Sequence, residues 1–384
     1  MYMPLLSPRG FKAFLRSTLS RTRQFESVAH LHALRAVFRI RINIAFHSPD
    51  AGWLLKKSNM QLFVDGDKAF QRIEQLLYQA QHTVMIQMFV WQDDTTGRRM
   101  ASVLLDIADR GVKVIIKKDA VGDFFEYHQD FLGTQKSKES FWMRFWKHSN
   151  ITVEHEKRHN HSKVYIIDGH TLLLTGMNLA DEYRYLWHDY MIELQGTRFV
   201  ESYLEEHASL CPNHAQIIMN TERVKNMRSA FTKLISEAQE SIVIEHVYFC
   251  DEDIVNLLAK RSAEGISVTV IIPEKPDFQH HANMHAIGQL LSQSHGQAQV
   301  FLYPGMFHAK LLLVDKKKLF IGSGNLMKNS LDQMGETNVL LQNGHTRLLW
   351  TVRETLRHDI LKSKPLTSPP QLRWMGRLLA WLRL

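Results

Sequence analysis

The sequence contains one pattern twice, in which a His is followed by a Lys two residues later and by an Asp seven residues later. The two copies are His161-Ser-Lys163-Val-Tyr-Ile-Ile-Asp168 and His308-Ala-Lys310-Leu-Leu-Leu-Val-Asp315, 147 positions apart. An Asn and a carboxylate follow at matching offsets, as Asn178 and Asp189 in the first half and as Asn325 and Glu336 in the second. Agreement at five positions is better explained by an internal duplication than by chance. The chain is therefore predicted to carry two half-sites, each with a His and a Lys.

Both halves alternate helix and strand before they reach the motif, which predicts an α/β fold. The expected helices cover 67–81 and 97–110 in the first half and 227–238 and 253–264 in the second, and the expected strands cover 83–91, 111–116, 241–249 and 265–272. The domains predicted from this order are a basic leader at 1–59, a first lobe at 60–200, a join at 201–225, a second lobe at 226–345 and a C-terminal segment at 346–384.

The first motif is predicted to be a β-hairpin. His161 and Lys163 are two residues apart on a strand, so their side chains point the same way. Asp168-Gly169 is a dipeptide typical of two-residue hairpin loops. Such a loop would place His161 opposite Gly176.

The second motif gives the same prediction. A like turn at Asp315-Lys316 would place His308 opposite Ser323. A small residue facing each His would leave room for a substrate phosphate. On this interpretation Asp168 and Asp315 shape the turns and take no part in the chemistry.

Charge narrows the class of partner. The chain has 384 residues, a formal net charge of +8 and a pI near 9.3. Its length suits two ordinary domains, and its basic balance suits an acidic partner, either nucleic acid or an anionic membrane. With only two Cys, a disulfide framework or a Cys-rich metal site is not expected. No run of apolar residues is long enough to span a bilayer.

The two ends favour a membrane surface. Residues 1–57 carry ten Lys or Arg against two acids. A Pro-containing linker at 364–370 leads into 371–384, where a helix would set a Trp/Leu face opposite an Arg face. Such a helix lies in a membrane interface, so both ends are predicted to contact an anionic membrane. The alternative is a terminal helix that docks on the protein's own core.

Two histidines in one site suit displacement at a phosphodiester. This reaction needs a nucleophile, an acid for the leaving alkoxide, and positive charge for the non-bridging oxygens. Histidine fills the first two roles near neutral pH. A coupled pair can hold one ring neutral to attack phosphorus and the other protonated to donate.

The other repeated residues supply the remaining functions. Lys163 and Lys310 offer positive charge to the phosphate oxygens, and Asn178 and Asn325 add side-chain amides. Asp189 and Glu336 are each predicted to accept a hydrogen bond from the far nitrogen of a His, which fixes its tautomer. No metal and no cofactor is expected, because the lysines supply the electrostatic stabilisation.

With this duplicated motif the chain resembles the phospholipase D superfamily over roughly residues 60–345. The resemblance implies a bilobed α/β fold of two lobes related by a pseudo-twofold axis, with one active site at their interface. It also implies a covalent phosphohistidine intermediate formed without metal. Since the first-motif His is usually the nucleophile in this family, it assigns His161 as nucleophile and His308 as acid/base.

Within the superfamily the chain looks most like bacterial cardiolipin synthases and related phosphatidyltransferases. The segments that carry this likeness are 119–123, 176–183, 187–189 and 247–249. Ser162 and Asn329 depart from it, since those enzymes usually have Arg at both positions. The likeness implies a phospholipid substrate and a peripheral position on the cytoplasmic face of the bacterial inner membrane.

The functional prediction is therefore a phosphatidyltransferase that moves a phosphatidyl group to an alcohol acceptor. The runner-up is a phosphodiesterase that uses water, either a phospholipase or a nuclease. A nuclease would explain the basic charge but gives no use for the Trp/Leu tail, so nucleic acid is the less expected partner. A catalytically inactive lipid-binding adaptor conflicts with two complete half-sites.

Three weaker features leave alternatives open. His155, His159 and His161 have metal-like spacing, but no carboxylate or Cys completes a set. His280, His281 and His285 are expected on a solvated loop. The aromatic run at 141–146 is equally consistent with a membrane-dipping lid and with core.

Overall fold

The computed structural model describes residues 59–119, 122, 136–156, 159–207, 210–211, 215–342, 344–372, 376 and 379–380. The basic leader predicted at 1–59 lies outside these residues except for its last position, as does most of the amphipathic segment at 371–384. Among the helices described, not one combines the length and the apolar content that crossing a membrane requires.

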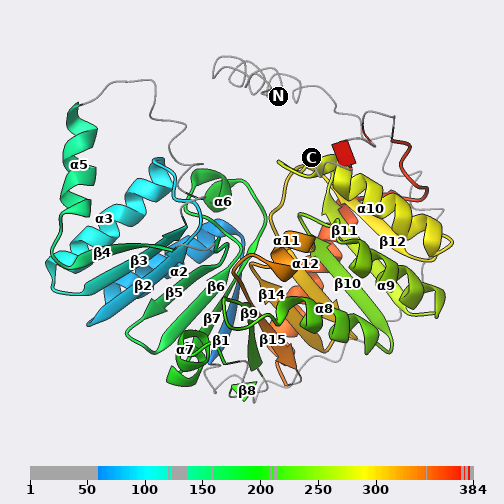
Figure 1. Cartoon of the computed structure of the whole chain (residues 1–384), viewed down its shortest axis with the longest axis horizontal. Helices are drawn as coiled ribbons and strands as arrows, with labels where there is room; N and C mark the ends of the chain where they lie inside the picture. Colours follow the sequence, from blue (N-terminus) through cyan, green and yellow to red (C-terminus); the bar gives the residue numbers. More distant parts are fainter. Residues whose placement is uncertain are drawn as a thin grey trace. The chain divides into compact units, whose positions relative to one another are not determined.

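The first lobe is built on a seven-stranded sheet in the order β1-β7-β6-β5-β2-β3-β4 (Figure 1). Its strands are β1 (Met60–Val64), β2 (Thr83–Met88), β3 (Lys113–Asp119), β4 (Ile151–Glu156), β5 (Lys163–Ile167), β6 (Thr171–Thr175) and β7 (Tyr190–Gln195). Its helices are α2 (Gly66–Gln79), α3 (Thr95–Asp109), α5 (Lys136–Trp146), α6 (Asp181–Tyr185) and α7 (Thr197–Leu204).

The second lobe repeats this plan on a nine-stranded sheet in the order β16-β12-β11-β10-β13-β14-β15-β9-β8. Its strands are β8 (Leu210–Cys211), β9 (Ala215–Asn220), β10 (Ser241–His246), β11 (Ser267–Pro273), β12 (Gln299–Tyr303), β13 (Lys310–Val314), β14 (Lys318–Gly322), β15 (Glu336–Gln342) and β16 (Lys364–Leu366). Its helices are α8 (Met227–Ser236), α9 (Glu252–Ala263), α10 (His280–Gln293), α11 (Lys328–Asp332) and α12 (Thr346–Lys362).

The two sheets match strand for strand, so the duplication extends far beyond the motif. The run β7-β6-β5-β2-β3-β4 of the first sheet corresponds to β15-β14-β13-β10-β11-β12 of the second. In each run the two central parallel strands follow helices, and the motif hairpin pairs antiparallel beside them. The α/β prediction and the bilobed arrangement are confirmed.

Alternating side chains explain why the sheets pack against each other. In β5, Val164 and Ile166 belong to an apolar core that also contains Leu311 and Leu313 of β13. The intervening Tyr165 of β5 faces instead a core shared with α2 and α3. Since successive strand residues point to opposite faces, each hairpin contributes to a central core between the sheets and to an outer core under helices. The two sheets therefore meet face to face. Helices α7 and α12 also contribute to this central core, while α2 and α3 cover the outer side of the first sheet and α8, α9 and α10 that of the second.

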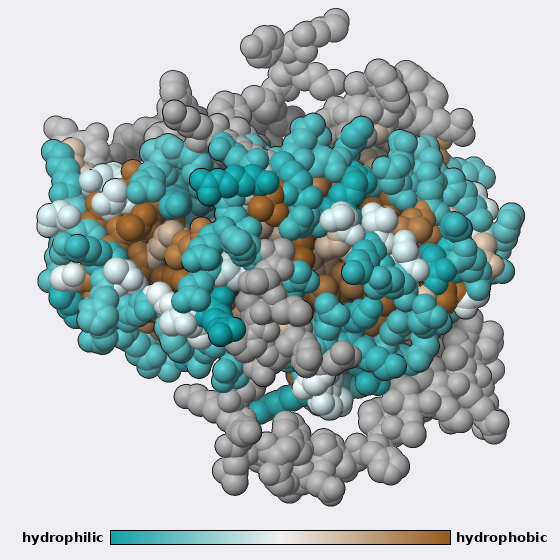
Figure 2. Space-filling view, turned by 60° about the horizontal axis from the view of Figure 1, so that its bottom comes forward, coloured by the Kyte–Doolittle hydropathy of each residue, from teal (hydrophilic) through white to brown (hydrophobic). Residues whose placement is uncertain are grey.

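On the face of the molecule that Figure 2 shows, hydrophilic side chains predominate among the described residues. Figure 2 shows one face, on which apolar side chains are visible in two areas, toward the left and the right of the view. This pattern agrees with two helix-covered cores, one in each lobe.

The motif turns differ from the two-residue loops expected. Ile167 pairs with Thr171 and Lys163 with Thr175, so the loop has three residues and the register is one position away from that predicted. The second hairpin behaves likewise, with Val314 opposite Lys318. The predicted pairings of His161 with Gly176 and of His308 with Ser323 are therefore wrong.

Backbone conformation explains the difference in loop length. Asp168 and Gly169 both have positive φ, at 51° and 62°, and His170 N donates to Ile167 O at 3.0 Å. Asp-Gly does form the tight turn expected of it, but His170 then adds a third residue before the ladder resumes. Asp315 and Lys316 adopt φ values of 51° and 57°, so Lys takes the place of Gly at the second turn.

Each motif Asp fastens its turn to the neighbouring strand. Asp168 accepts hydrogen bonds from the backbone N–H groups of Gln81, His82 and Thr83 at 2.8–2.9 Å. Asp315 accepts them from residues 239, 240 and 241 at 2.7–3.1 Å. These contacts support the interpretation that both Asp residues are structural.

Three segments differ from the sequence-based expectation. The join at 201–225 contains β9, which pairs with β15 inside the second sheet. The linker at 364–370 begins with β16, where Pro365 sits on an edge strand and needs no ladder N–H. His280 and His281 lie in the first turn of α10 and not on a loop.

The aromatic run at 141–146 divides between core and surface. Phe145 is fully buried, while Met143 and Trp146 are about half exposed. Trp142 Nε1 donates to Asp93 at 3.1 Å, which fixes the inner face of α5 against the first lobe.

Removing one motif carboxylate should cost stability without removing the chemistry. Asp315→Ala deprives three backbone N–H groups of a charged acceptor, so we expect the free energy of unfolding to fall by about 2–4 kcal/mol. Asp315→Asn, which keeps one acceptor oxygen, should lose less. Urea denaturation measures both. A loss below about 0.5 kcal/mol for Asp315→Ala would contradict the structural role.

Candidate active site

The two motif hairpins bring their histidines to the junction between the lobes. Each His precedes its first hairpin strand, and its backbone bonds to the opposite half of the molecule. His161 N donates to Gly335 O at 2.7 Å, and His308 N donates to His188 O at 2.8 Å. Gly335 and His188 stand immediately before the two repeated carboxylates. Each His is thus fixed by the lobe that does not contain it.

The repeated carboxylates pair crosswise with the histidines. His161 Nδ1 lies 3.2 Å from Glu336 Oε1, and His308 Nδ1 lies 3.0 Å from Asp189 Oδ2. All four side chains are buried, and the most accessible, His161, is 8% exposed. The hydrogen bonds predicted from sequence are therefore present, and each of them crosses between the lobes. Engagement of Nδ1 leaves Nε2 of each ring for chemistry.

The two histidines also lie close enough to act on each other electrostatically. Burial lowers the pKa of His308 well below its usual range, and the charges of Lys310, Lys163 and His161 add to this effect. Burial likewise lowers the pKa of His161 to about 4, with further contributions from both lysines. Both rings are therefore neutral near pH 7 before substrate binds. A bound phosphodiester anion would favour protonation of one of them.

The lysines are buried with the histidines. Lys163 and Lys310 are each 1% exposed, and each Nζ donates to the backbone carbonyl of its own motif His, at 2.7 and 2.6 Å. Burial lowers the pKa of Lys310 to about 8 and that of Lys163 well below its usual value. A buried ammonium is costly unless it is paired, and an anionic substrate would supply the opposite charge.

Lys163 and Lys310 differ in their surroundings. Lys310 Nζ lies 2.8 Å from His308 Nδ1 and 3.2 Å from Nε2. Lys163 Nζ instead lies 5.2 Å from the centre of the Phe89 ring. The two half-sites are thus related but not equivalent.

Glu336, the carboxylate paired with His161, has a lower pKa than Asp189, the carboxylate paired with His308. Ser323 and Ser330 donate their hydroxyls to the two oxygens of Glu336, both at 2.6 Å. Burial alone would raise the pKa of Glu336, but His161, Lys163 and Ser323 together hold it below its usual value. Burial raises the pKa of Asp189 to about 7. Glu336 is therefore the carboxylate that stays ionised near neutral pH.

Gly176 and Ser323, which were expected to leave room for a phosphate, contact the two carboxylates instead. A Cβ on Gly176 would come within 2.5 Å of Asp189 Oδ2, so glycine is needed there to admit that carboxylate. Its repeat counterpart Ser323 donates to Glu336. The one-residue change in hairpin register explains why sequence reasoning placed them wrongly.

The repeated asparagines anchor loops. Asn178 Oδ1 accepts from Val90 N at 3.2 Å, and its Nδ2 donates to the Tyr183 hydroxyl at 2.8 Å. Asn325 N donates to Ser330 Oγ, while its buried Oδ1 has no hydrogen-bond partner among the residues described. The direct contact of these amides with a phosphate, expected from sequence, remains a prediction.

Aromatic rings surround both histidines, and the pattern of the repeat gave no sign of them. Phe89 packs edge-on against His161 at 4.8 Å. Tyr183 and Trp187 contact His308 at 5.0 and 6.0 Å from the first lobe, and Tyr248 contacts it at 6.3 Å from the second. These rings exclude water and produce the burial that lowers both imidazole pKa values.

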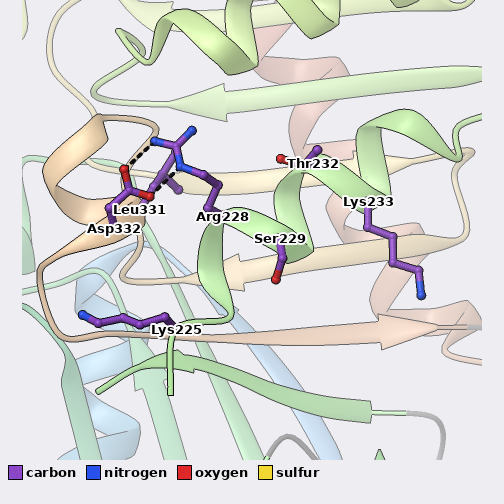
Figure 3. Close-up of a pocket in the computed structure, with 7 residues that line it drawn as sticks. All are labelled: Lys225, Arg228, Ser229, Thr232, Lys233, Leu331 and Asp332. Atoms are coloured by element: carbon purple, nitrogen blue, oxygen red, sulfur yellow. Dashed lines mark hydrogen bonds and ion pairs between the residues drawn. The ribbon is translucent and has the colours of Figure 1, made fainter. Parts of the chain in front are cut away.

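A surface hollow of about 560 Å³ lies elsewhere, on the second lobe between α8 and α11 (Figure 3). Lys225, Ser229 and Lys233 contribute to its lining, but none of the motif residues does. Its central Arg228 is bound to Asp332, as drawn in Figure 3, and also to Asp251. Its charge is already compensated, so the hollow is no rival to the paired histidines as a phosphate site.

The His161 ring should titrate far below an ordinary histidine. We expect NMR of ring-labelled protein to show His161 neutral from pH 8 down to about 5 and protonated only near pH 4. Because the Glu336 charge raises this pKa, Glu336→Gln should lower it further. His161→Ala assigns the signal. A midpoint near 6.5 in the folded protein would contradict the buried environment.

Comparison with known proteins agrees with this geometry. A family model described as "Cardiolipin synthase, PLD-like domain" matches residues 73–211 and 231–358, well over half of the chain. The chain is 28% identical to the major cardiolipin synthase ClsA of Bacillus subtilis, covering 86% of this chain and 76% of the relative. It is 25% identical to a cardiolipin synthase of Halalkalibacterium halodurans, covering 87% and 74%.

Solved structures share the fold. A phosphatidylserine synthase of Haemophilus influenzae matches with a TM-score of 0.66 at 14% identity, covering 84% of this chain and 92% of that one. A polyphosphate kinase of Porphyromonas gingivalis matches with a TM-score of 0.56 at 14% identity, covering 84% and 52%. The duplicated motif, the matched sheets and the family model agree: the chain belongs to the cardiolipin synthase-like family of the phospholipase D superfamily, and it is an enzyme of that type.

Proposed function

We propose that this enzyme transfers a phosphatidyl group from a donor phospholipid to an alcohol acceptor through a phosphohistidine on His161. The observation that supports this proposal most strongly is the crossed pairing of two buried histidines with Glu336 and Asp189 beside two buried lysines. The constellation offers two nitrogen bases and two cations, which suits displacement at an anionic phosphorus.

In the first half-reaction, His161 Nε2 attacks the phosphorus of the donor and the bond to the headgroup oxygen breaks. His308, protonated once the anionic substrate is bound, gives its proton to that leaving oxygen. Lys163 and Lys310 offset the charge that develops on the non-bridging oxygens. The products are a free headgroup alcohol and a phosphatidyl group bonded to His161.

In the second half-reaction, neutral His308 removes the proton from an acceptor hydroxyl. The resulting alkoxide attacks phosphorus, the phosphorus–nitrogen bond breaks and His161 leaves as a neutral ring. Both halves use the same groups in opposite order, as ping-pong catalysis requires. His308 ends with a proton and is ready for the next donor.

The hydrogen bonds around Glu336 favour His161 as the nucleophile. Attack leaves the His161 ring with positive charge, and Glu336, which also accepts the hydroxyls of Ser323 and Ser330, stabilises that charge through Nδ1. His161 is also more accessible than His308, at 8% against 2% exposure. Both observations favour the assignment implied by the family resemblance.

A phospholipid substrate is the inference from the relatives' names and from the surroundings of the site. Exposed apolar residues lie next to the rings that surround His308. Leu186 of the first lobe is 76% exposed, and Phe278, whose ring lies 6.4 Å from Tyr248, is 49% exposed. Apolar side chains in this position suit the acyl chains of a lipid.

We also propose that the protein works as a peripheral enzyme on the cytoplasmic face of the bacterial inner membrane. The basic leader and the Trp/Leu tail, both read from the sequence, support contact with an anionic surface. Of the tail, Leu372 packs with the second-lobe core, and a Cβ on Gly376 would meet His281 at 3.3 Å. The start of the tail is thus close to α10, where docking and membrane contact compete.

A covalent intermediate should be trapped on one ring. With donor phosphatidylglycerol labelled in the phosphatidyl group, rapid quenching at alkaline pH and mass spectrometry should find the label on His161. His161→Ala should lose both the label and turnover, by at least about 10⁴-fold. His285→Ala, which alters an exposed histidine, is the matched control and should behave as wild type. Label on His308 alone would reverse the assignment.

The acceptor decides between transferase and hydrolase. Purified enzyme on phosphatidylglycerol vesicles should form a product with two phosphatidyl groups and release glycerol. Predominant phosphatidic acid would show that water is the acceptor. In a parallel reaction, nicked single-stranded DNA with untouched vesicles would identify a nuclease and contradict the lipid substrate.

A further inference from the structure

A second buried cluster of ionisable side chains lies at the lobe junction, outside the proposed catalytic residues. His188 precedes β7 of the first lobe, Glu245 lies on β10 of the second, and Asp359 lies on α12. Their exposures are 8%, 0% and 2%. One donor atom from each lies within 4.8 Å of the others. Two buried carboxylates thus converge on one imidazole.

Three carboxylates, those of Asp65, Glu245 and Asp359, surround one imidazole, so the cluster is short of positive charge even with that ring protonated. His188 Nδ1 donates to Asp65 Oδ1 at 2.5 Å. Burial alone would lower the pKa of His188, but Asp65, Glu245 and Asp359 together raise it well above its usual value. The Tyr190 hydroxyl donates its only proton to Glu245 Oε2 at 2.6 Å. The Tyr190 oxygen, 3.1 Å from His188 Nε2, is then left to accept a hydrogen bond from that nitrogen.

Unpartnered oxygens point to the same deficit. Within the residues described, Glu245 Oε1 and Asp359 Oδ2 are buried and have no hydrogen-bond partner. Asp359 Oδ2 lies 3.5 Å from His188 Nε2, which is beyond a good hydrogen bond. A buried carboxylate without partners is costly unless it is paired or binds a metal.

We propose that His188, Glu245 and Asp359 bind one divalent transition-metal ion, best matched by Zn²⁺, as a structural clamp between the lobes. An imidazole with two carboxylates is a donor set that zinc accepts. The ion would add the missing positive charge in place of the His188 Nε2 proton and give Asp359 Oδ2 a partner.

The distances fit a tetrahedral ion. Ligand atoms about 2.0–2.1 Å from zinc are about 3.4 Å apart at tetrahedral angles. His188 Nε2 lies 3.5 Å from Asp359 Oδ2 and 3.7 Å from Glu245 Oε2. The Tyr190 oxygen lies 2.6 Å from Glu245 Oε2, too close for a further ligand, so Tyr190 would stay a hydrogen-bond donor to that carboxylate. The cluster thus needs only small movements to close around an ion.

Asp65 hydrogen-bonds to the His188 nitrogen that would not bind the ion. A metal-binding His usually donates its other ring N–H to a carboxylate, which fixes the tautomer and orients the ring. Asp65 follows β1 and contacts His188 Nδ1 in this way. Asp65 therefore acts as a positioning residue and does not bind the ion itself.

The clamp would act on the catalytic groups through the backbone. His188 O accepts the hydrogen bond from His308 N, and the next residue, Asp189, pairs with the His308 ring. An ion that joins His188 of one lobe to Glu245 and Asp359 of the other would fix this segment where the active site is assembled.

Metal content of the full-length, untagged protein tests the proposal. The protein is dialysed against a weak chelator, then against a measured excess of Zn²⁺, and is then desalted. We expect inductively coupled plasma mass spectrometry to find about one zinc per chain. Zinc should raise the melting temperature by about 5 °C, and a strong chelator should reverse this rise. Co²⁺ in place of zinc should give the visible absorption of a tetrahedral site. Less than 0.1 zinc per chain would overturn the proposal and leave a protonated His188 as the cation of the cluster.

Matched variants locate the ion. Asp359→Asn and Glu245→Gln should each lower zinc content at least tenfold, with circular dichroism confirming that the chain is folded. Asp65→Asn, at a side chain that is 60% exposed, should fold normally and weaken zinc affinity 10–100-fold. The double variant His281→Ala with His285→Ala removes surface histidines of α10 and should retain zinc. Zinc that disappears only in that double variant would assign the binding to the surface and refute the clamp.

Discussion

The proposed active site depends on two buried carboxylate–imidazole hydrogen bonds that cross from one lobe to the other. Glu336 of the second lobe holds His161 of the first, and Asp189 of the first holds His308 of the second. Neither lobe alone contains a His with its carboxylate, so each half-site forms only when the lobes pack together. The apolar core between the sheets, to which both motif hairpins contribute, thus fixes the catalytic geometry as well as the fold.

The two half-sites contain equivalent residues, but a few differences between the repeats give them different surroundings. Where the first lobe has Gly176 against Asp189, the second has Ser323 donating to Glu336. The added hydroxyl joins His161 and Lys163 in holding the pKa of Glu336 below its usual value. A symmetric pair of rings would share nucleophile and acid roles equally, whereas this difference favours one ring for attack.

Much of this arrangement could be predicted from residue spacing. The offsets of the motif gave the repeat, and the 28-residue step from each His to a carboxylate gave the partner residues. Hydrophobic periodicity placed α9 and β11 within two residues of their observed bounds. Spacing within a half cannot show that the bonds run between halves, because the crossing is a property of how the lobes pack.

The exact geometry of the motif turns was the other feature that the sequence did not predict. Asp-Gly predicted a tight turn correctly, but the third loop residue, His170, is specified by the ladder beyond the turn. That single residue moved Gly176 and Ser323 from facing a phosphate to contacting carboxylates. The cluster of His188, Glu245 and Asp359 was equally hidden, because its members come from three distant segments with no shared motif. Its proximity to His308 links the stability of the lobe junction to the site.

The most direct test of a shared phosphorus is a crystal structure with bound vanadate or tungstate. We expect one oxyanion with Nε2 of His161 and Nε2 of His308 both within about 3 Å of it, on opposite sides. An oxyanion that contacts only one of the two rings would contradict it.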